Sequence, residues 1–110
     1  MKKSIDTIPS EIENCPIFKT LLLFQGKWNI WVIYELSTKD FIRFGELKKA
    51  IPDISNTMLT STLKGLEEIG LVHREQFNEI PPHVEYSATE KAKKLKPIFE
   101  AMWKYGEENL

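Results

Sequence analysis

The segment from Ile54 to Leu71 constrains the fold more than any other part of the chain, because its two sides differ in chemistry. Its large apolar residues recur at steps of four, three and three positions: Leu59, Leu63, Leu66 and Ile69. This spacing predicts one apolar stripe along a helix. Ser55 is a suitable N-cap, and Gly70 is a suitable residue for the left-handed turn that ends a helix. We therefore expect an amphipathic helix over residues 55–70.

The opposite side of this helix carries short hydrogen-bonding side chains and one cation: Ser55, Asn56, Thr57, Thr60, Ser61 and Lys64. An ordinary solvated face would mix Glu and Lys, as the segment does only at Glu67 and Glu68. Small donors and acceptors can approach base edges in a major groove, as in the second helix of a helix-turn-helix. A merely solvated face is an equal alternative on these residues alone, and the hairpin predicted behind the helix favours base contact.

The chain of 110 residues, 42% of them hydrophobic, fits one domain with a small core. Its formal net charge of −1 provides no general attraction for nucleic acid, so any phosphate contact depends on the local placement of charge. The single cysteine, Cys15, excludes an internal disulfide and a multi-cysteine metal site. The sequence shows neither a bilayer-spanning run nor a signal peptide, and we expect a cytoplasmic protein with no membrane partner.

Residues 1–14 are polar and are predicted to form an arm, in which Lys2 and Lys3 are most simply solvated. Two helices are expected within 15–36, over 17–24 and 27–36, although β-branched residues in the second also permit a strand. A short extended piece, 41–43, precedes a helix over 44–51. Together with the helix described above, this short helix predicts a helix-turn-helix over residues 44–70.

After Gly70 the pattern changes to period two, which predicts strands over 71–77 and 84–88 joined by a proline-bearing tip. This hairpin, within residues 71–88, would form a protruding wing. Thr89 is expected to cap a final helix over 90–108, kinked at Pro97. The predicted fold class is mainly α with a small β-hairpin wing, a winged helix-turn-helix.

The first and last helices carry more apolar surface than a domain of this size can cover. We expect helices 15–36 and 90–108 to contribute both to the core and to a homodimer interface. The predicted interface residues are Ile17, Leu21, Phe24, Phe99, Met102 and Trp103.

Candidate phosphate contacts are the cationic residues near the helix-turn-helix and the wing: Arg43, Lys48, Lys49, Arg74 and His83. Such contacts position a protein on DNA without reading its sequence. Each is as well explained as an ordinary surface charge, and Arg74 on the wing is the strongest candidate.

The sequence lacks a nucleophile–histidine–acid arrangement, a glycine-rich phosphate loop and a metal-ligand cluster. The two histidines, His73 and His83, have no evident partner. We therefore expect neither enzymatic activity nor a metal or other cofactor.

Several short motifs appear in a fixed order from Cys15 onward: Cys15-Pro16, Gly26-Lys27-Trp28, Arg43-Phe44, Glu46-Leu47, Ile54-Ser55, Met58-Leu59-Thr60, Leu63-Lys64, Leu66-Glu67, Gly70-Leu71-Val72 and Pro81 to Thr89. In this order and spacing the chain resembles the HxlR-type winged-helix transcriptional regulators, relatives of the MarR-like regulators. It departs from their pattern at Ala88, where Leu is usual, and at Lys91-Ala92, where Gly is common. Both changes are expected to affect packing behind the wing and to leave the DNA-reading surface unchanged.

The resemblance implies a homodimer that binds double-stranded DNA at a pseudo-palindromic operator through paired helices and wings. The alternative is a winged-helix module that binds a protein through the same surface, which the near-neutral charge would suit.

Several members of the resembled family use a cysteine at the position of Cys15 to sense electrophiles or oxidants. The start of a helix favours the thiolate, the form that such reagents attack. The other interpretation is a small apolar residue packed in the dimer interface. The sequence favours packing slightly, because Lys19 is the only cation close to Cys15.

Overall fold

The computed structural model describes residues 10–110, and these form seven helices and three strands. The helices are α1 (Ser10–Glu13), α2 (Pro16–Leu23), α3 (Gly26–Leu36), α4 (Phe44–Ala50), α5 (Asn56–Glu68), α6 (Glu90–Lys93) and α7 (Lys96–Asn109). The strands are β1 (Ile42–Arg43), β2 (Val72–Phe77) and β3 (His83–Ala88). The predictions for Lys2 and Lys3 lie outside the described residues, and the end of the predicted arm forms the single turn α1.

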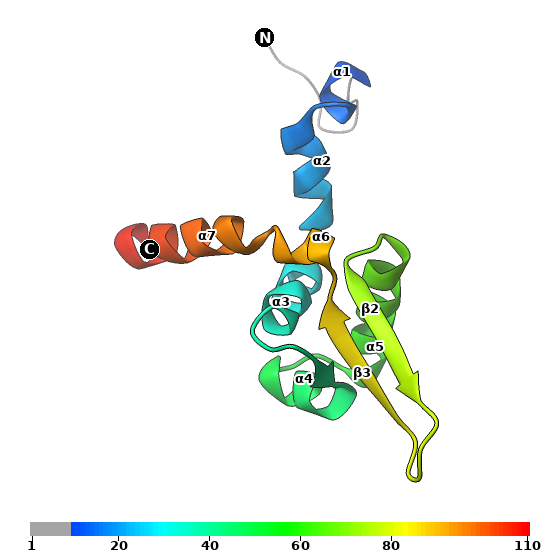
Figure 1. Cartoon of the computed structure of the whole chain (residues 1–110). Coiled ribbons are helices and arrows are strands. Elements are labelled where there is room, and N and C mark those ends of the chain that lie inside the picture. The colour runs from blue at the N-terminus through cyan, green and yellow to red at the C-terminus, as the bar shows by residue number, and fades with distance from the viewer. Residues whose placement is uncertain (1–9) are drawn as a thin grey trace.

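The three strands form one antiparallel sheet in the order β1-β3-β2. The hairpin runs from Val72 opposite Ala88 to Phe77 opposite His83, and β1 joins it with Ile42 opposite Tyr86. The hairpin extends beyond the helices as a wing (Figure 1). The predicted fold class, mainly α with a β-hairpin wing, is confirmed.

One hydrophobic core lies between α3, α4, α5, the base of the wing and α6. From α5 it receives Leu59, Leu63 and Leu66, as the spacing predicted. Ile69, the fourth member of the predicted stripe, is 43% exposed. It occupies the C-cap, where the chain leaves the helix, and its side chain therefore no longer follows the stripe.

Both ends of α5 are closed by the predicted residues. The Ser55 hydroxyl accepts a hydrogen bond from the Met58 amide at 3.0 Å. Gly70 has φ +81°, and the amides of Gly70 and Leu71 donate to the carbonyls of Glu67 and Leu66. These two bonds form a Schellman motif, which fixes the direction in which the wing leaves the helix.

The prediction of one kinked C-terminal helix is wrong in form, because the chain breaks into α6 and α7 around Leu95. Pro97 lies in the first turn of α7. At this position the missing proline amide costs no helical hydrogen bond, so the proline begins a helix instead of bending one.

Helices α2 and α7 extend away from the core in different directions (Figure 1). The radius of gyration is 16.2 Å, whereas a compact domain of this length has a value of about 13 Å. Trp31 on α3 is 38% exposed. Within residues 10–110, no helix has the length and apolar character needed to cross a bilayer.

Candidate nucleic-acid interface

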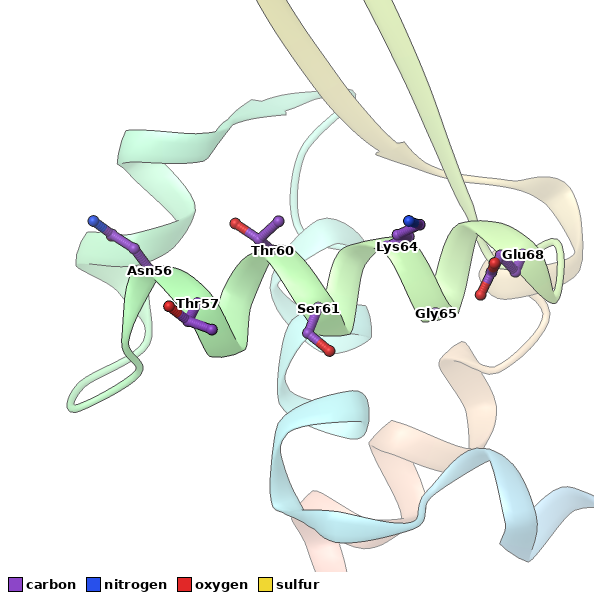
Figure 2. Close-up of a pocket in the computed structure, with 7 residues that line it drawn as sticks. All are labelled: Asn56, Thr57, Thr60, Ser61, Lys64, Gly65 and Glu68. Atoms are coloured by element: carbon purple, nitrogen blue, oxygen red, sulfur yellow. The ribbon is translucent and has the colours of Figure 1, made fainter.

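The outward face of α5 presents the predicted polar side chains together. Figure 2 shows them along one side of the helix, from Asn56 to Glu68. Asn56, Thr57, Thr60, Ser61 and Lys64 are all exposed and line a shallow open groove. The buried leucines on the other side hold this face outward.

The first part of this face is the one suited to DNA. Its side chains before Lys64 are neutral, Lys64 is a cation, and acidic residues follow at Glu67 and Glu68. An anionic duplex would be repelled by that acidic end. Ser55 is exposed, and its oxygen already accepts one hydrogen bond from the Met58 amide, which fixes the side chain as the cap of the helix.

Gly65 also lines the groove, and the sequence-based list of site residues omitted it. A β-carbon built at Gly65 would meet no atom within 4 Å. Packing within the chain therefore does not require this glycine. Its lack of a side chain leaves room for a partner to approach the helix. The spacing of the polar residues alone does not identify Gly65 as part of this surface.

The candidate phosphate contacts are spread over the three strands and α4. Arg43 is exposed at the start of α4, where its backbone amide donates to Glu46 Oε1 at 3.1 Å. Lys48 and Lys49 lie in the last turn of α4. Arg74 is exposed on β2, with one guanidinium nitrogen 3.5 Å from Gln76 Oε1. Of these four cations, Arg43, Lys49 and Arg74 are exposed and Lys48 is half-buried.

His83 is in a different environment from these four cations. Its ring stacks on Phe77 with centroids 4.8 Å apart. Its Nε2 lies 3.2 Å from Glu85 Oε2, and its Nδ1 lies 3.8 Å from Glu79 Oε2. The side chain is only 18% exposed. Two carboxylates beside the ring oppose the approach of a phosphate while the ring is neutral.

Cys15 is the N-cap of α2 and is half-buried. Its amide donates to the Ile12 carbonyl, and its carbonyl accepts from the Lys19 amide, both at 2.9 Å. The backbone of Cys15 thus joins α1 to α2, while its thiol is partly accessible.

The predicted interface residues divide into two groups. Ile17, Leu21, Met102 and Trp103 are exposed on the protruding helices, Ile17 to 72% and Trp103 to 64%. Phe99, by contrast, is only 8% exposed, and Phe24 packs against it with ring centroids 6.2 Å apart. The structure therefore places these two phenylalanines in contacts within the protomer.

The predicted list omitted three further exposed apolar residues on these helices: Leu22, Ile98 and Tyr105. Ile98, Met102 and Tyr105 follow a spacing of four and three positions, so they share one side of α7. The same spacing was visible in the sequence. Among the described residues, no group of three or more His, Cys, Asp or Glu side chains is placed to hold a metal ion.

Residues 23–110 match the model of the HxlR-like helix-turn-helix family. The chain belongs to that family. It is 45% identical over 98 residues to an uncharacterised HTH-type transcriptional regulator of Halalkalibacterium halodurans, covering 89% of this chain and 87% of the relative. It is 39% identical to the uncharacterised HTH-type regulator YdzF of Bacillus subtilis, covering 86% of each chain. The regulator identity implied by the motifs is confirmed.

Solved structures with the same fold include a protein of Porphyromonas gingivalis described as a MarR-family transcriptional regulator. It has a TM-score of 0.83 and 45% identity, over 89% of this chain and 95% of the other. The redox regulator HypR in its oxidised form has a TM-score of 0.78 and 41% identity, over 87% and 98%. Reduced YodB of B. subtilis, a transcriptional regulator, has a TM-score of 0.75 and 33% identity, over 86% and 93%.

Two of the three residues that depart from the family pattern lie in the core, and the third, Lys91, is exposed. Ala88 and Ala92 are both buried, at the end of β3 and in α6. Both alanines lie away from the outward face of α5.

Proposed function

We propose that this regulator is a homodimer that binds a pseudo-palindromic DNA operator with α5 and its wing. The observation that carries the proposal is the outward face of α5, where small neutral hydrogen-bonding groups precede a single cation. Side chains of this kind can reach base edges in a major groove. Arg43 and Arg74, on either side of α5 in the chain, are the candidates for phosphate contact.

The dimer is supported by the two protruding helices. Exposed residues such as Ile17, Leu21 and Trp103 form apolar surface that is in contact with water in a monomer, and burying this surface in a dimer is favourable. A two-fold interface built from α2 and α7 would present two copies of α5. To enter successive major grooves, these must lie about 34 Å apart, one turn of B-DNA.

We further propose that Cys15 makes operator binding sensitive to oxidants or electrophiles. Two findings support it: the thiol is partly accessible at the start of α2, and a similar protein, HypR, is described as a redox regulator. Modification at this position would displace α2 and thereby alter the spacing of the two recognition helices.

Salt dependence separates DNA binding from the alternative, a winged-helix module that binds a protein. An operator selected from random duplexes should bind with an affinity that falls linearly with salt on logarithmic axes. Replacement of Arg74 by Gln should reduce this slope by about one unit if Arg74 neutralises a phosphate. Lys104→Gln on α7 is the matched control and should leave the slope unchanged. A chain that selects no duplex, or one whose binding ignores salt, would contradict the proposal.

The Cys15 hypothesis is tested on the same operator. Diamide with added glutathione, which joins the Cys15 thiol to glutathione in a mixed disulfide while diamide takes up the two electrons and two protons, should weaken binding by the wild type and leave Cys15→Ser unaffected, as measured by fluorescence anisotropy. Equal responses of the two proteins, or no response in either, would remove Cys15 from the mechanism while leaving DNA binding intact.

A further inference from the structure

Both histidines of the chain lie on the same hairpin and on the same side of it. The chain contains two histidines, His73 on β2 and His83 on β3. His73 is opposite Ser87 in the register, Glu75 is opposite Glu85, and Phe77 is opposite His83. Residues that are opposite each other, or two apart on a strand, point to the same face of a sheet. One face of the wing therefore carries every imidazole of the protein.

Each imidazole lies against a glutamate of the same face. His73 Nε2 is 3.0 Å from Glu75 Oε1, and His83 Nε2 is 3.2 Å from Glu85 Oε2. The two glutamates are directly opposite each other across the strands. The carboxylates of Glu75 and Glu85 therefore repel each other. A positive charge on either neighbouring imidazole would reduce this repulsion, and a neutral imidazole would not.

The other charged groups on the elements packed against the hairpin are cations and carboxylates in nearly equal number. Arg43 on β1 is opposite Glu85, and Glu79 in the turn lies 3.8 Å from His83 Nδ1. On the helices packed against β3, Glu46 accepts the Arg43 amide and Lys91 donates to the Ile69 carbonyl. The remaining charged residues on α4 and α6 are Lys48, Lys49 and Lys93, and Lys93 pairs with Glu90. Helix α3, which also packs against β3, carries Lys27 and Glu35, and α5, which packs against β2, carries Lys64, Glu67 and Glu68.

The wing itself has few cations. From Val72 to Ala88 the sequence contains one arginine, three glutamates and two histidines, and neither Lys nor Arg occurs between Gln76 and Ala88. The formal charge of the wing is therefore −2 when both histidines are neutral and zero when both are protonated. Histidine is the side chain that ordinarily changes charge between pH 5 and pH 8.

We propose that the wing is a pH-dependent contact for DNA: protonation of His73 and His83 cancels its acidic charge and strengthens binding as pH falls. This inference rests on the proposed DNA-binding function. A polyanion favours the imidazolium form, so the bound state takes up protons. Affinity must then rise as pH decreases through the histidine range.

The test is the affinity for a duplex of about three helical turns, measured by anisotropy from pH 8 to pH 5.5 at constant ionic strength with EDTA. Each imidazolium that neutralises one phosphate should raise affinity roughly ten-fold at 0.1 M salt and steepen the salt slope at low pH by about one unit. The double variant His73→Gln/His83→Gln should lose most of this pH dependence. Thermal unfolding at each pH verifies that both proteins remain folded.

A carboxylate variant tests the charge mechanism separately. Glu85→Gln should raise affinity at pH 8 and flatten the profile, because it removes permanently the charge that protonation of His83 offsets. Glu107→Gln on α7 is the matched control and should behave as the wild type. If the double histidine variant keeps the wild-type pH dependence, the wing inference fails and the proposed function survives. If the wild type binds no duplex at any pH, both fail.

Discussion

Leu59 and Thr60 are neighbours in the chain, yet they serve different purposes because the helix turns them to opposite sides. Leu59 is fully buried, and Thr60 is exposed in the polar groove. Leu59→Ala should lower the free energy of unfolding by about 2–5 kcal/mol, since it removes buried methyl groups and leaves a cavity. Thr60→Ala should change stability by less than about 0.5 kcal/mol.

For operator affinity, Thr60→Ala should have the larger effect of the two variants. Thr60→Ala should weaken binding by about 0.5–1.5 kcal/mol, the net contribution of one hydrogen bond. Leu59→Ala should bind normally at a temperature where it remains folded. Urea unfolding and anisotropy measure the two quantities. Normal operator binding by Thr60→Ala would exclude Thr60 from the base contacts.

At the residue scale, signals that act within one turn of chain were predictable. Ser55 and Gly70 cap α5 because their side-chain and backbone preferences are local. The environment of His83 was not predictable in the same way, although Glu85 is only two residues away. It depends on the register that places Phe77 opposite His83, and on the fold of the turn that carries Glu79. Residue type alone therefore suggested a simple phosphate contact.

At the scale of elements, the junction between α5, the wing and α6 depends on one side chain. The Thr89 hydroxyl donates to the Gly70 carbonyl at 2.7 Å and accepts from the Ala92 amide at 3.2 Å. Thr89 thus caps α6 and also holds it to the turn that ends α5. Its first role was visible in the sequence, and its second requires two segments 19 residues apart to meet.

Thr89→Ala should therefore destabilise the protein by about 1–2 kcal/mol, as loss of a helix cap does. Thr89→Ser keeps the hydroxyl and should lose less than half of that amount. Urea unfolding of the three proteins gives the comparison, and hydrogen exchange should show the loss at the base of the wing. Equal stability of the Ala and Ser variants would mean that these two hydrogen bonds contribute nothing.

The order of helices and strands was predictable from periodicity, but their breaks were less so. Pro97 was expected to bend a continuous helix, and instead α7 begins at Lys96. A proline is compatible with either outcome. The choice depends on how Leu95 and Phe99, both buried, reach the core. Such a requirement of tertiary packing leaves no signal in the local sequence.

At the scale of the whole molecule, the excess of apolar residues at the two ends was evident from the sequence, but its division was not. Phe24 and Phe99 fill the protomer, while Leu21 and Trp103 remain exposed on the protruding helices. The residues of both groups are hydrophobic, so hydrophobicity alone does not tell the buried residues from the exposed ones. Only the direction of α2 and α7 relative to the core decides which residues are left for a second subunit.

This division predicts the effect of a charge on the exposed surface of α7. Trp103 is 64% exposed in the protomer, so Trp103→Glu should leave the fold of one subunit intact. In the proposed two-fold dimer both copies of the new carboxylate would be buried without a partner, at a combined cost of about 3 kcal/mol. The dimer dissociation constant should therefore rise about a hundred-fold. Sedimentation measures the oligomeric state, and circular dichroism verifies the fold.

Ile80→Glu provides the control, because Ile80 is fully exposed at the tip of the wing and equally apolar. This variant should dimerise like the wild type. The monomeric Trp103→Glu variant should also bind the full operator more weakly than the wild type, with an affinity close to that for a single half-site, because its two recognition helices are no longer linked. A Trp103→Glu protein that sediments as the wild type does would remove this side chain from the interface, and a monomeric wild type would overturn the dimer itself.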